Sequence, residues 1–279
     1  MPLNLAAVRA GLKGKNQMTR LLLSSACLFA LSALTAAPAL ANAITVDGAY
    51  DNYDFTNGLP RADGFDVNAS ANLSLPWSNL SAEFVLGDDG VGGQHTFDVG
   101  GGVVWTDPDF RLAGTVTYNR GSAAGFINLD ETTISGGGEW YFSDSVTVGA
   151  QAGVIAGRFA GGFASGAVKV YVMPDLSVGG FATFSEWKPS GFKVVNETDF
   201  GAKGEFLISE DFPLTIQAGY THEQVSGFGF PLFNARANVF SVGVRVYLDS
   251  SSAPVTLIQH NRTGTLDTIG PIHPFWFNF

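Results

Sequence analysis

The sequence predicts an all-β protein, a transmembrane antiparallel up-and-down β-barrel of twelve strands, with ten strands as the alternative count. Three observations predict this fold. Apolar and polar residues alternate with a period of two, tight turns rich in Pro, Asp and Ser recur between the alternating segments, and aromatic residues gather near segment ends. Period-two alternation is typical of strands whose two faces meet different surroundings. In a membrane barrel those surroundings are lipid outside and the lumen inside.

The composition argues against several other classes of protein. The 279 residues are 46% hydrophobic and only 14% charged, with 35 glycines and one cysteine. Soluble domains usually carry about 25% charged residues. No segment after residue 43 approaches the roughly 18 to 20 consecutive apolar residues that a membrane helix needs. The chain is therefore unlike an ordinary soluble α/β enzyme, a helical membrane protein or a disordered chain.

Residues 1–43 have the pattern of a secretory signal peptide. Basic residues precede the apolar run Leu21–Leu34, and small residues follow at Ala37–Ala43. This order of a positive, an apolar and a small-residue region is that of a cleaved signal. Cleavage is expected after Ala41 or Ala43, and Met18 is an alternative start.

The mature chain is acidic and lacks cysteine. It keeps 11 Lys and Arg against 25 Asp and Glu, a formal charge of −14. It can form no disulfide in an oxidising compartment. Nucleic-acid binding needs a basic surface, so we expect no nucleic-acid partner. The same charge disfavours peripheral binding to anionic lipid surfaces.

The expected strands lie in the alternating part of the chain, residues 44–248. In one of them Phe97, Val99 and Val103 form an apolar row, while Asp98 belongs to the opposite face. Most of the segments are close to the 9–11 residues with which a tilted strand crosses a bilayer. The expected strands are 44–53, 64–75, 79–87, 95–105, 110–119, 132–142, 145–156, 164–173, 176–186, 197–208, 213–223 and 236–248.

The connections between these strands alternate in character. Every second connection is a tight turn, such as Pro174-Asp175, because Pro fixes one turn dihedral and Asp bonds its own backbone. The others are expected to be longer, Gly-rich loops at 54–63, 88–94, 120–131, 157–163, 187–196 and 224–235. Short turns on one side and longer loops on the other are typical of a transmembrane barrel.

A soluble β-sandwich would show the same alternation, with its apolar rows buried. Aromatic residues at strand ends favour the membrane barrel, since aromatic girdles lie at the two membrane interfaces. The expected girdle residues are Phe55, Trp77, Trp105, Tyr118, Trp140, Phe142, Phe184, Trp187, Phe212 and Tyr220.

The last expected strand carries an assembly motif. Ser241, Gly243, Val246 and Leu248 occupy a polar, a glycine and two hydrophobic positions with fixed spacing. This pattern resembles the C-terminal assembly signal of bacterial outer-membrane barrels. Together with the segment Val99–Asp107, it makes residues 44–248 similar to porin-like outer-membrane proteins of Gram-negative bacteria. The resemblance implies outer-membrane residence, contact with lipid and lipopolysaccharide, and insertion by the barrel assembly machinery.

The chain departs from the resemblance at its end. Residues 249–279 follow the motif, whereas the signal is normally terminal. Pro271 and Pro274 would remove donors from a strand ladder, so we expect a periplasmic extension, with a further pairing segment as the alternative. The aromatic end, Phe275–Phe279, is expected to dock in the barrel mouth, on its lip or on a partner.

The inward rows hold the candidate functional residues. Charges in a water-filled lumen set ion selectivity, and an excess of acids favours cations; in a plugged lumen they form buried ion pairs instead. The alternation also places Asp47 and Asp66 inward. The candidate lumen-lining residues are Glu83, Asp98, Arg111, Glu139, Lys169, Asp199, Lys203, Glu205 and Arg245.

The sequence gives little support for metal binding or catalysis. None of the four histidines has metal-ligand spacing, and we expect no metal and no cofactor. His222, with Glu223 adjacent and Ser226 nearby, admits a surface hydrolase, but a triad needs a geometry that this spacing does not supply. We therefore expect no enzymatic activity. The expected function is passive diffusion of small solutes through a narrow, cation-preferring lumen. The alternative is a non-conducting structural or surface-interaction barrel.

Overall fold

The computed structural model of the protein describes residues 43–56, 61–75, 79–91, 94–123, 127–189, 194–209, 213–227, 236–249 and 256–263. Apart from Ala43, the predicted signal peptide lies outside these residues, as do Trp77, Phe212 and the aromatic end Phe275–Phe279.

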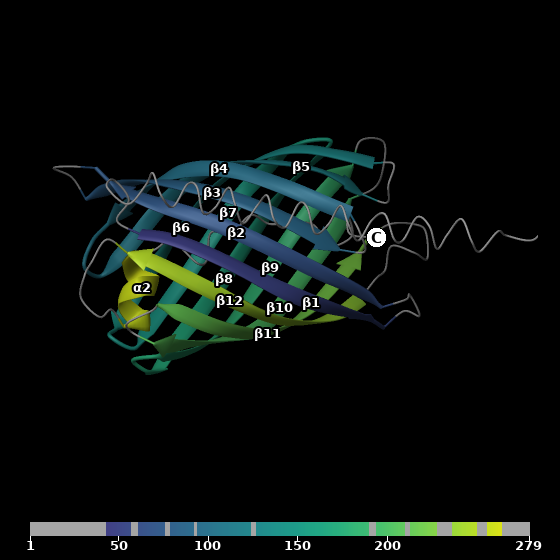
Figure 1. Ribbon diagram of the computed structural model, residues 1–279. Helices are drawn as coiled ribbons and strands as arrows, with labels where there is room; N and C mark the ends of the chain where they lie inside the picture. Colours follow the sequence, from purple (N-terminus) through teal and green to yellow (C-terminus); the bar gives the residue numbers. More distant parts are fainter. Residues whose placement is uncertain are drawn as a thin grey trace, which may run out of the picture. The chain divides into compact units, whose positions relative to one another are not determined.

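Twelve antiparallel strands form the described fold (Figure 1). Each strand runs beside its neighbour in the sequence, and β12 pairs with β1 to close the barrel. The strands are β1 (Ala43–Phe55), β2 (Ala62–Ser74), β3 (Leu80–Val91), β4 (Gln94–Thr106), β5 (Phe110–Ala123), β6 (Ile127–Ser143), β7 (Val146–Gly157), β8 (Phe159–Met173), β9 (Leu176–Pro189), β10 (Val195–Ser209), β11 (Leu214–Ser226) and β12 (Arg236–Asp249). The prediction of a twelve-stranded up-and-down barrel is confirmed, and the ten-strand alternative is wrong.

The seam between β1 and β12 closes the sheet completely. Its register pairs every residue from Ala43 opposite Asp249 to Phe55 opposite Ala237. A Cβ atom at Gly243 would lie 2.7 Å from the carbonyl oxygen of Gly48 and 2.8 Å from the Cβ of Ala49. Only glycine lets the two strands approach so closely at this point. Closure leaves no unpaired edge, which a sheet needs if it is to span lipid.

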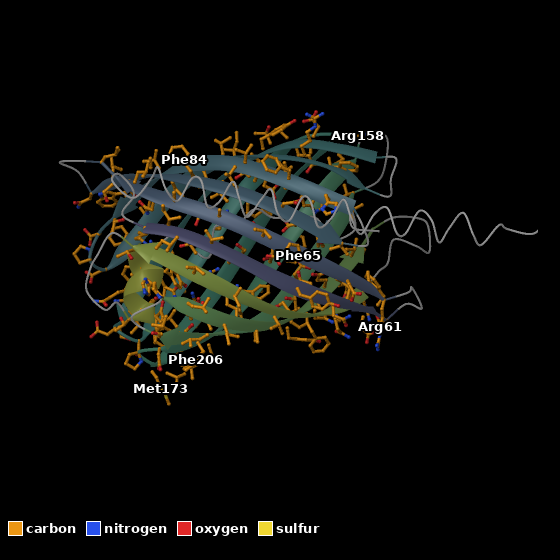
Figure 2. All side chains as sticks on the ribbon, viewed as in Figure 1. Arg61, Phe65, Phe84, Arg158, Met173 and Phe206 are labelled. Atoms are coloured by element: carbon orange, nitrogen blue, oxygen red, sulfur yellow. The ribbon has the colours of Figure 1, made fainter. Side chains whose placement is uncertain are left out.

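The apolar rows face away from the lumen. Phe97, Val99, Phe206 and Ile216 are 41–49% exposed, so they are not sealed between two sheets. Figure 2 shows Phe84 and Phe206 projecting outward from opposite sides of the barrel wall. Their inward-facing neighbours, such as Asp98 and Glu205, are buried. This inversion of the usual soluble pattern distinguishes a membrane barrel from a sandwich.

The connections differ from the prediction at one end of the barrel. We call the end with residues 107–109, 144–145 and 174–175 the short-turn end, and the other the loop end. Three connections expected to be long are short, because the strands extend into them: residues 92–93, 124–126 and 158. The turn at 158 depends on Gly157, whose φ of 143° strongly favours glycine. Gly-rich sequence therefore marked strand residues here rather than loops.

Two expected girdle residues point inward instead. Phe55 is 8% exposed and Trp187 is fully buried, both inside the barrel at its loop end. Their positions follow the parity of their strands, since Phe55 lies four residues after the inward Asp51. The described girdle residues on the outer face are Trp105, Tyr118, Trp140, Phe142, Phe184 and Tyr220, all at least 36% exposed.

A short helix follows the barrel. Helix α2 (Leu257–Thr263) belongs to the segment expected as a periplasmic extension, and it lies at the short-turn end beside the end of β12 (Figure 1). Its first N–H donates to the carbonyl of Pro174 in the β8–β9 turn. No described helix is long and apolar enough to cross a membrane.

Candidate functional site

The lumen contains a cavity of about 570 Å³. It reaches from Tyr53 and Val91 at the loop end to Asn261 and Arg262 of α2 at the short-turn end. Nine carboxylate residues and four basic residues line it, together with hydroxyl, amide and glycine positions. The charged lining of the cavity is therefore predominantly acidic, and the cavity extends along the barrel.

The predicted lumen residues fall into two groups. Six of them line the cavity: Glu139, Lys169, Asp199, Lys203, Glu205 and Arg245. The other three, Glu83, Asp98 and Arg111, are each no more than 1% exposed and do not line the cavity. Alternation identifies the rows on which these nine residues lie, but it does not separate residues that line the cavity from residues covered by neighbouring side chains.

An ion pair anchors the short-turn end of the lumen. Arg111 on β5 donates from Nη2 to Glu139 Oε2 on β6 at 2.7 Å, and both side chains are buried. The same Nη2 donates to the backbone carbonyl of Asn261 in α2 at 2.9 Å. Charge-assisted bonds of this length are strong, and burial makes them stronger. The helix thus supplies a second acceptor to Nη2 of a buried guanidinium.

Glu205 is the centre of a second network at the same end. Its Oε1 accepts from Tyr247 at 2.7 Å, from Thr215 at 2.9 Å and from Gln217 at 3.2 Å. Asn261 of α2 enters this network too, because its Oδ1 lies 2.8 Å from the hydroxyl oxygen of Tyr247 and its Nδ2 approaches Glu205 Oε2 at 3.5 Å. These contacts satisfy a carboxylate that is only 4% exposed.

Arg245 connects this network to the barrel seam. Its Nε lies 3.6 Å from Asp47 Oδ1 on β1, and its Nη1 lies 3.8 Å from Glu205 Oε1 on β10. Asp47 and Arg245 occupy opposed positions in the β1–β12 register. The short-turn half of the lumen therefore balances acids with bases.

The loop-end half is different, because its charges are acidic. Six carboxylates line the cavity there, and we call them the acidic arc: Asp51, Asp66, Asp89, Glu197, Asp199 and Glu223. They belong to strands of one continuous series, β10, β11, β12, β1, β2 and β3, in which β12 contributes none. On the loop side of Lys203 and Arg245, the described inward rows of these six strands carry no Lys or Arg.

Two pairs within the acidic arc face each other directly across neighbouring strands. Asp66 is opposite Asp89, and Asp199 is opposite Glu223. Like charges in opposed positions destabilise a sheet. The arc therefore does not serve stability, and such departures from folding rules are found at functional sites.

A hydrophobic cluster, which the sequence interpretation missed, lies beyond the acidic arc. We call it the loop-end cluster, and it contains Tyr53, Phe55, Val91, Ile155, Phe159, Phe163, Trp187, Val195, Val225, Ala237 and Val239. Trp187 links it to the arc, since its Nε1 donates to Ser185 and Ser185 donates to Glu197. Strand parity contained the signal, because each of these residues continues an inward row.

The remaining candidates have plain structural positions. His222 Nδ1 lies 2.9 Å from Asn238 Oδ1, and its ring packs on Phe200 on the outer face. No group of three or more His, Cys, Asp or Glu within the described ranges could hold a metal ion. In the assembly motif, Ser241 and Gly243 line the cavity, while Val246 and Leu248 lie on the outward row of β12.

Comparisons with known proteins identify the fold. No family model matches the sequence, and no curated protein matches it. Among solved structures, the COG4313 outer membrane channel from Pseudomonas putida F1 has a TM-score of 0.57 at 12% identity, covering 75% of this chain and 96% of that one. The NanC porin has a TM-score of 0.53 at 9% identity, covering 73% and 100%. This chain has the closed-barrel fold of outer-membrane porin-like proteins.

Proposed function

We propose that this protein is a bacterial outer-membrane channel that passes small cationic or neutral solutes by passive diffusion. The observation that carries the proposal is the lumen cavity, which is lined by nine carboxylate and four basic residues inside a barrel with an apolar outer face. Fixed charges along a narrow aqueous path set which ions enter. The acidic arc attracts cations and repels anions at the loop-end half.

The size of the barrel suits a narrow path. Barrels of about eight strands are filled by side chains, whereas barrels of 16 to 18 strands leave wide aqueous channels. Twelve strands lie between these limits. A cavity of about 570 Å³ that extends along the lumen can hold a small solute with its hydration shell, but not an oligomeric solute such as a long oligosaccharide.

The outer surface supports the proposed location. Its exposed apolar rows suit lipid, and its aromatic residues suit the two interfaces. Lipid, lipopolysaccharide and the barrel assembly machinery would then be its partners. The inward Ser241 and Gly243 and the outward Val246 and Leu248 would present the assembly motif at the seam.

One observation favours a second candidate function. The loop-end cluster and α2 occupy the two ends of the cavity. A lumen obstructed at both ends suits a non-conducting barrel that acts through its surface. Conductance separates the two proposals.

The test measures reversal potentials of the purified protein in planar bilayers at pH 8. Replacing Asp51 and Asp89 by Asn removes two charges of the acidic arc. At about 8 Å in water one charge contributes about 0.5 kcal/mol, roughly a factor of two in local cation concentration. We expect the cation-to-anion permeability ratio to fall at least about twofold.

The matched control replaces Asp63 and Asp88 by Asn. These two acids belong to the same region of β2 and β3 but lie on the outward rows, where Asp63 accepts from Tyr50 and Asp88 lies beside His95. The control should keep the parent ratio. If the parent protein gives no conductance, and still gives none when substitutions detach helix α2 from the barrel, the non-conducting barrel is favoured instead.

A further inference from the structure

Helix α2 contacts strands on opposite sides of the lumen at the short-turn end, which we call the short-turn mouth. Asn261 alone reaches Arg111 on β5 and both Glu205 on β10 and Tyr247 on β12. In the closed order of twelve strands, β5 and β10 are five strands apart, almost as far apart as two strands can be. A residue that contacts both cannot lie on the rim, so it crosses the lumen.

Apolar and aromatic contacts hold the helix in this position. Leu257 is fully buried against Tyr171, Leu207 and Tyr247, three inward residues of the short-turn end. His260 is 2% exposed, and its ring stacks on that of Tyr247 with centroids 4.6 Å apart. These contacts give the helix a defined seat within the mouth rather than a loose position beside it.

Arg262 fastens the helix to the turn on the other side. Its Nη2 donates to the carbonyl of Ser143 at 2.7 Å, and its guanidinium lies 4.4 Å from the ring centroid of Tyr141. Together with the contact of Leu257 to Pro174, this attaches α2 to two separate short turns. The opposite face of the helix is exposed at Gln259 and Thr263.

We propose that α2 is a displaceable plug that closes the short-turn mouth of the lumen. Its apolar contacts come from the single side chain of Leu257 and from rings stacked or packed on His260 and Arg262, and the rest are hydrogen bonds that water can replace once the helix moves. When α2 leaves, Arg111, Glu139 and Glu205 become the charged lining of an open mouth. That release of α2 would increase permeation rests on the proposed channel function; that α2 closes the mouth does not.

The test uses a thiol probe inside the lumen of the mature chain, with α2 and the rest of the C-terminal segment retained. The mature chain has no cysteine, so Ser177→Cys introduces the one reactive thiol. Ser177 lines the cavity and is 2% exposed. Its reaction with a small cationic methanethiosulfonate is compared in detergent between this parent and two α2 variants, the double variant Leu257→Asp with Asn261→Ala and the single variant Arg262→Ala.

We expect the double variant to react at least about tenfold faster than the parent. Leu257→Asp places a charge in a buried apolar site, and Asn261→Ala removes the side-chain contacts with Tyr247 and Glu205, so α2 is released. Thr263→Ala is the matched control, since the Thr263 hydroxyl approaches the carbonyls of Gln259 and His260 within α2; it should react at the parent rate. Heat-modifiable migration shows whether each barrel is folded. If the double variant does not fold, Arg262→Ala decides, with an expected increase of about threefold.

Equal labelling rates in the parent and the folded release variants would overturn the plug, whatever the conductance. Faster labelling together with larger conductance supports both the plug and the channel. Faster labelling in a barrel that remains electrically silent supports the plug and overturns the channel proposal.

Discussion

At the scale of single residues, Arg111 and Glu139 show how the lumen tolerates charge. Their side chains are 1% and 6% exposed, so the two charges compensate each other, and the carbonyl of Asn261 accepts a further bond from Arg111. A buried pair gains little over an apolar pair of the same shape, but removing one partner leaves an uncompensated charge. The pair is therefore a sensitive point of the fold.

We expect Glu139→Gln to lower the free energy of unfolding by about 3–5 kcal/mol, because Arg111 loses its counter-charge in a buried site. Urea titration of the barrel in detergent, followed by heat-modifiable migration, measures this change. The exposed pair of Arg61 and Asp54 offers a control, and Arg61→Ala should cost less than about 1 kcal/mol. Similar costs for the two variants would show that water reaches Arg111.

At the scale of strands and helices, periodicity is sufficient to predict the twelve strands. It could not give the strand ends at the loop side, because Gly-rich residues such as Gly161 and Gly162 occur in strands and loops alike. Periodicity also did not predict helix α2. A helix of seven residues is too short to show a repeating pattern, and its stability comes from tertiary contacts. Phe55 and Trp187 lie at strand ends, where girdle residues are expected, but the parity of their strands directs both side chains inward.

Trp187 offers a test of the loop-end cluster as an element of the channel. It is fully buried at the centre of contacts from several strands. We expect Trp187→Ala to cost about 3–5 kcal/mol in unfolding free energy. If the cluster narrows the loop-side entrance, the same variant should increase single-channel conductance, measured in planar bilayers.

Trp105→Ala is the control for that substitution, because Trp105 faces outward and is 39% exposed. It removes the same side chain from the lipid side and should leave the conductance unchanged. Equal conductance of the Trp187 variant and the parent would place the rate-limiting constriction elsewhere in the lumen.

At the scale of the whole molecule, the charge of the lumen is divided along the barrel. The short-turn half pairs its acids with Arg111 and Arg245, whereas the described inward rows of the acidic arc carry no Lys or Arg on the loop side of Lys203 and Arg245. A solute that enters from the loop side therefore meets a negative field first. This division depends on which strand positions lie at the same end, so it follows from topology and could not be seen in the total charge.

We expect the cation preference to weaken as salt increases. The Debye length falls from about 10 Å at 0.1 M to about 3 Å at 1 M, which is shorter than the distance across a lumen of this kind. Reversal potentials under a fixed ratio of salt concentrations should therefore move toward zero as both concentrations rise. A preference that does not change with salt would indicate selection by direct coordination instead of by the field of the acidic arc.

The pairing of β1 with β12 also sets an order of events during folding. The strand that leads the barrel cannot complete its hydrogen bonds until the strand nearest the other terminus is in place, nearly two hundred residues later in the chain. Contacts so distant in sequence form slowly and late. Until then β1 is an unpaired edge to which a strand of another chain can bind. A nascent barrel therefore needs protection of this edge until β12 pairs with it.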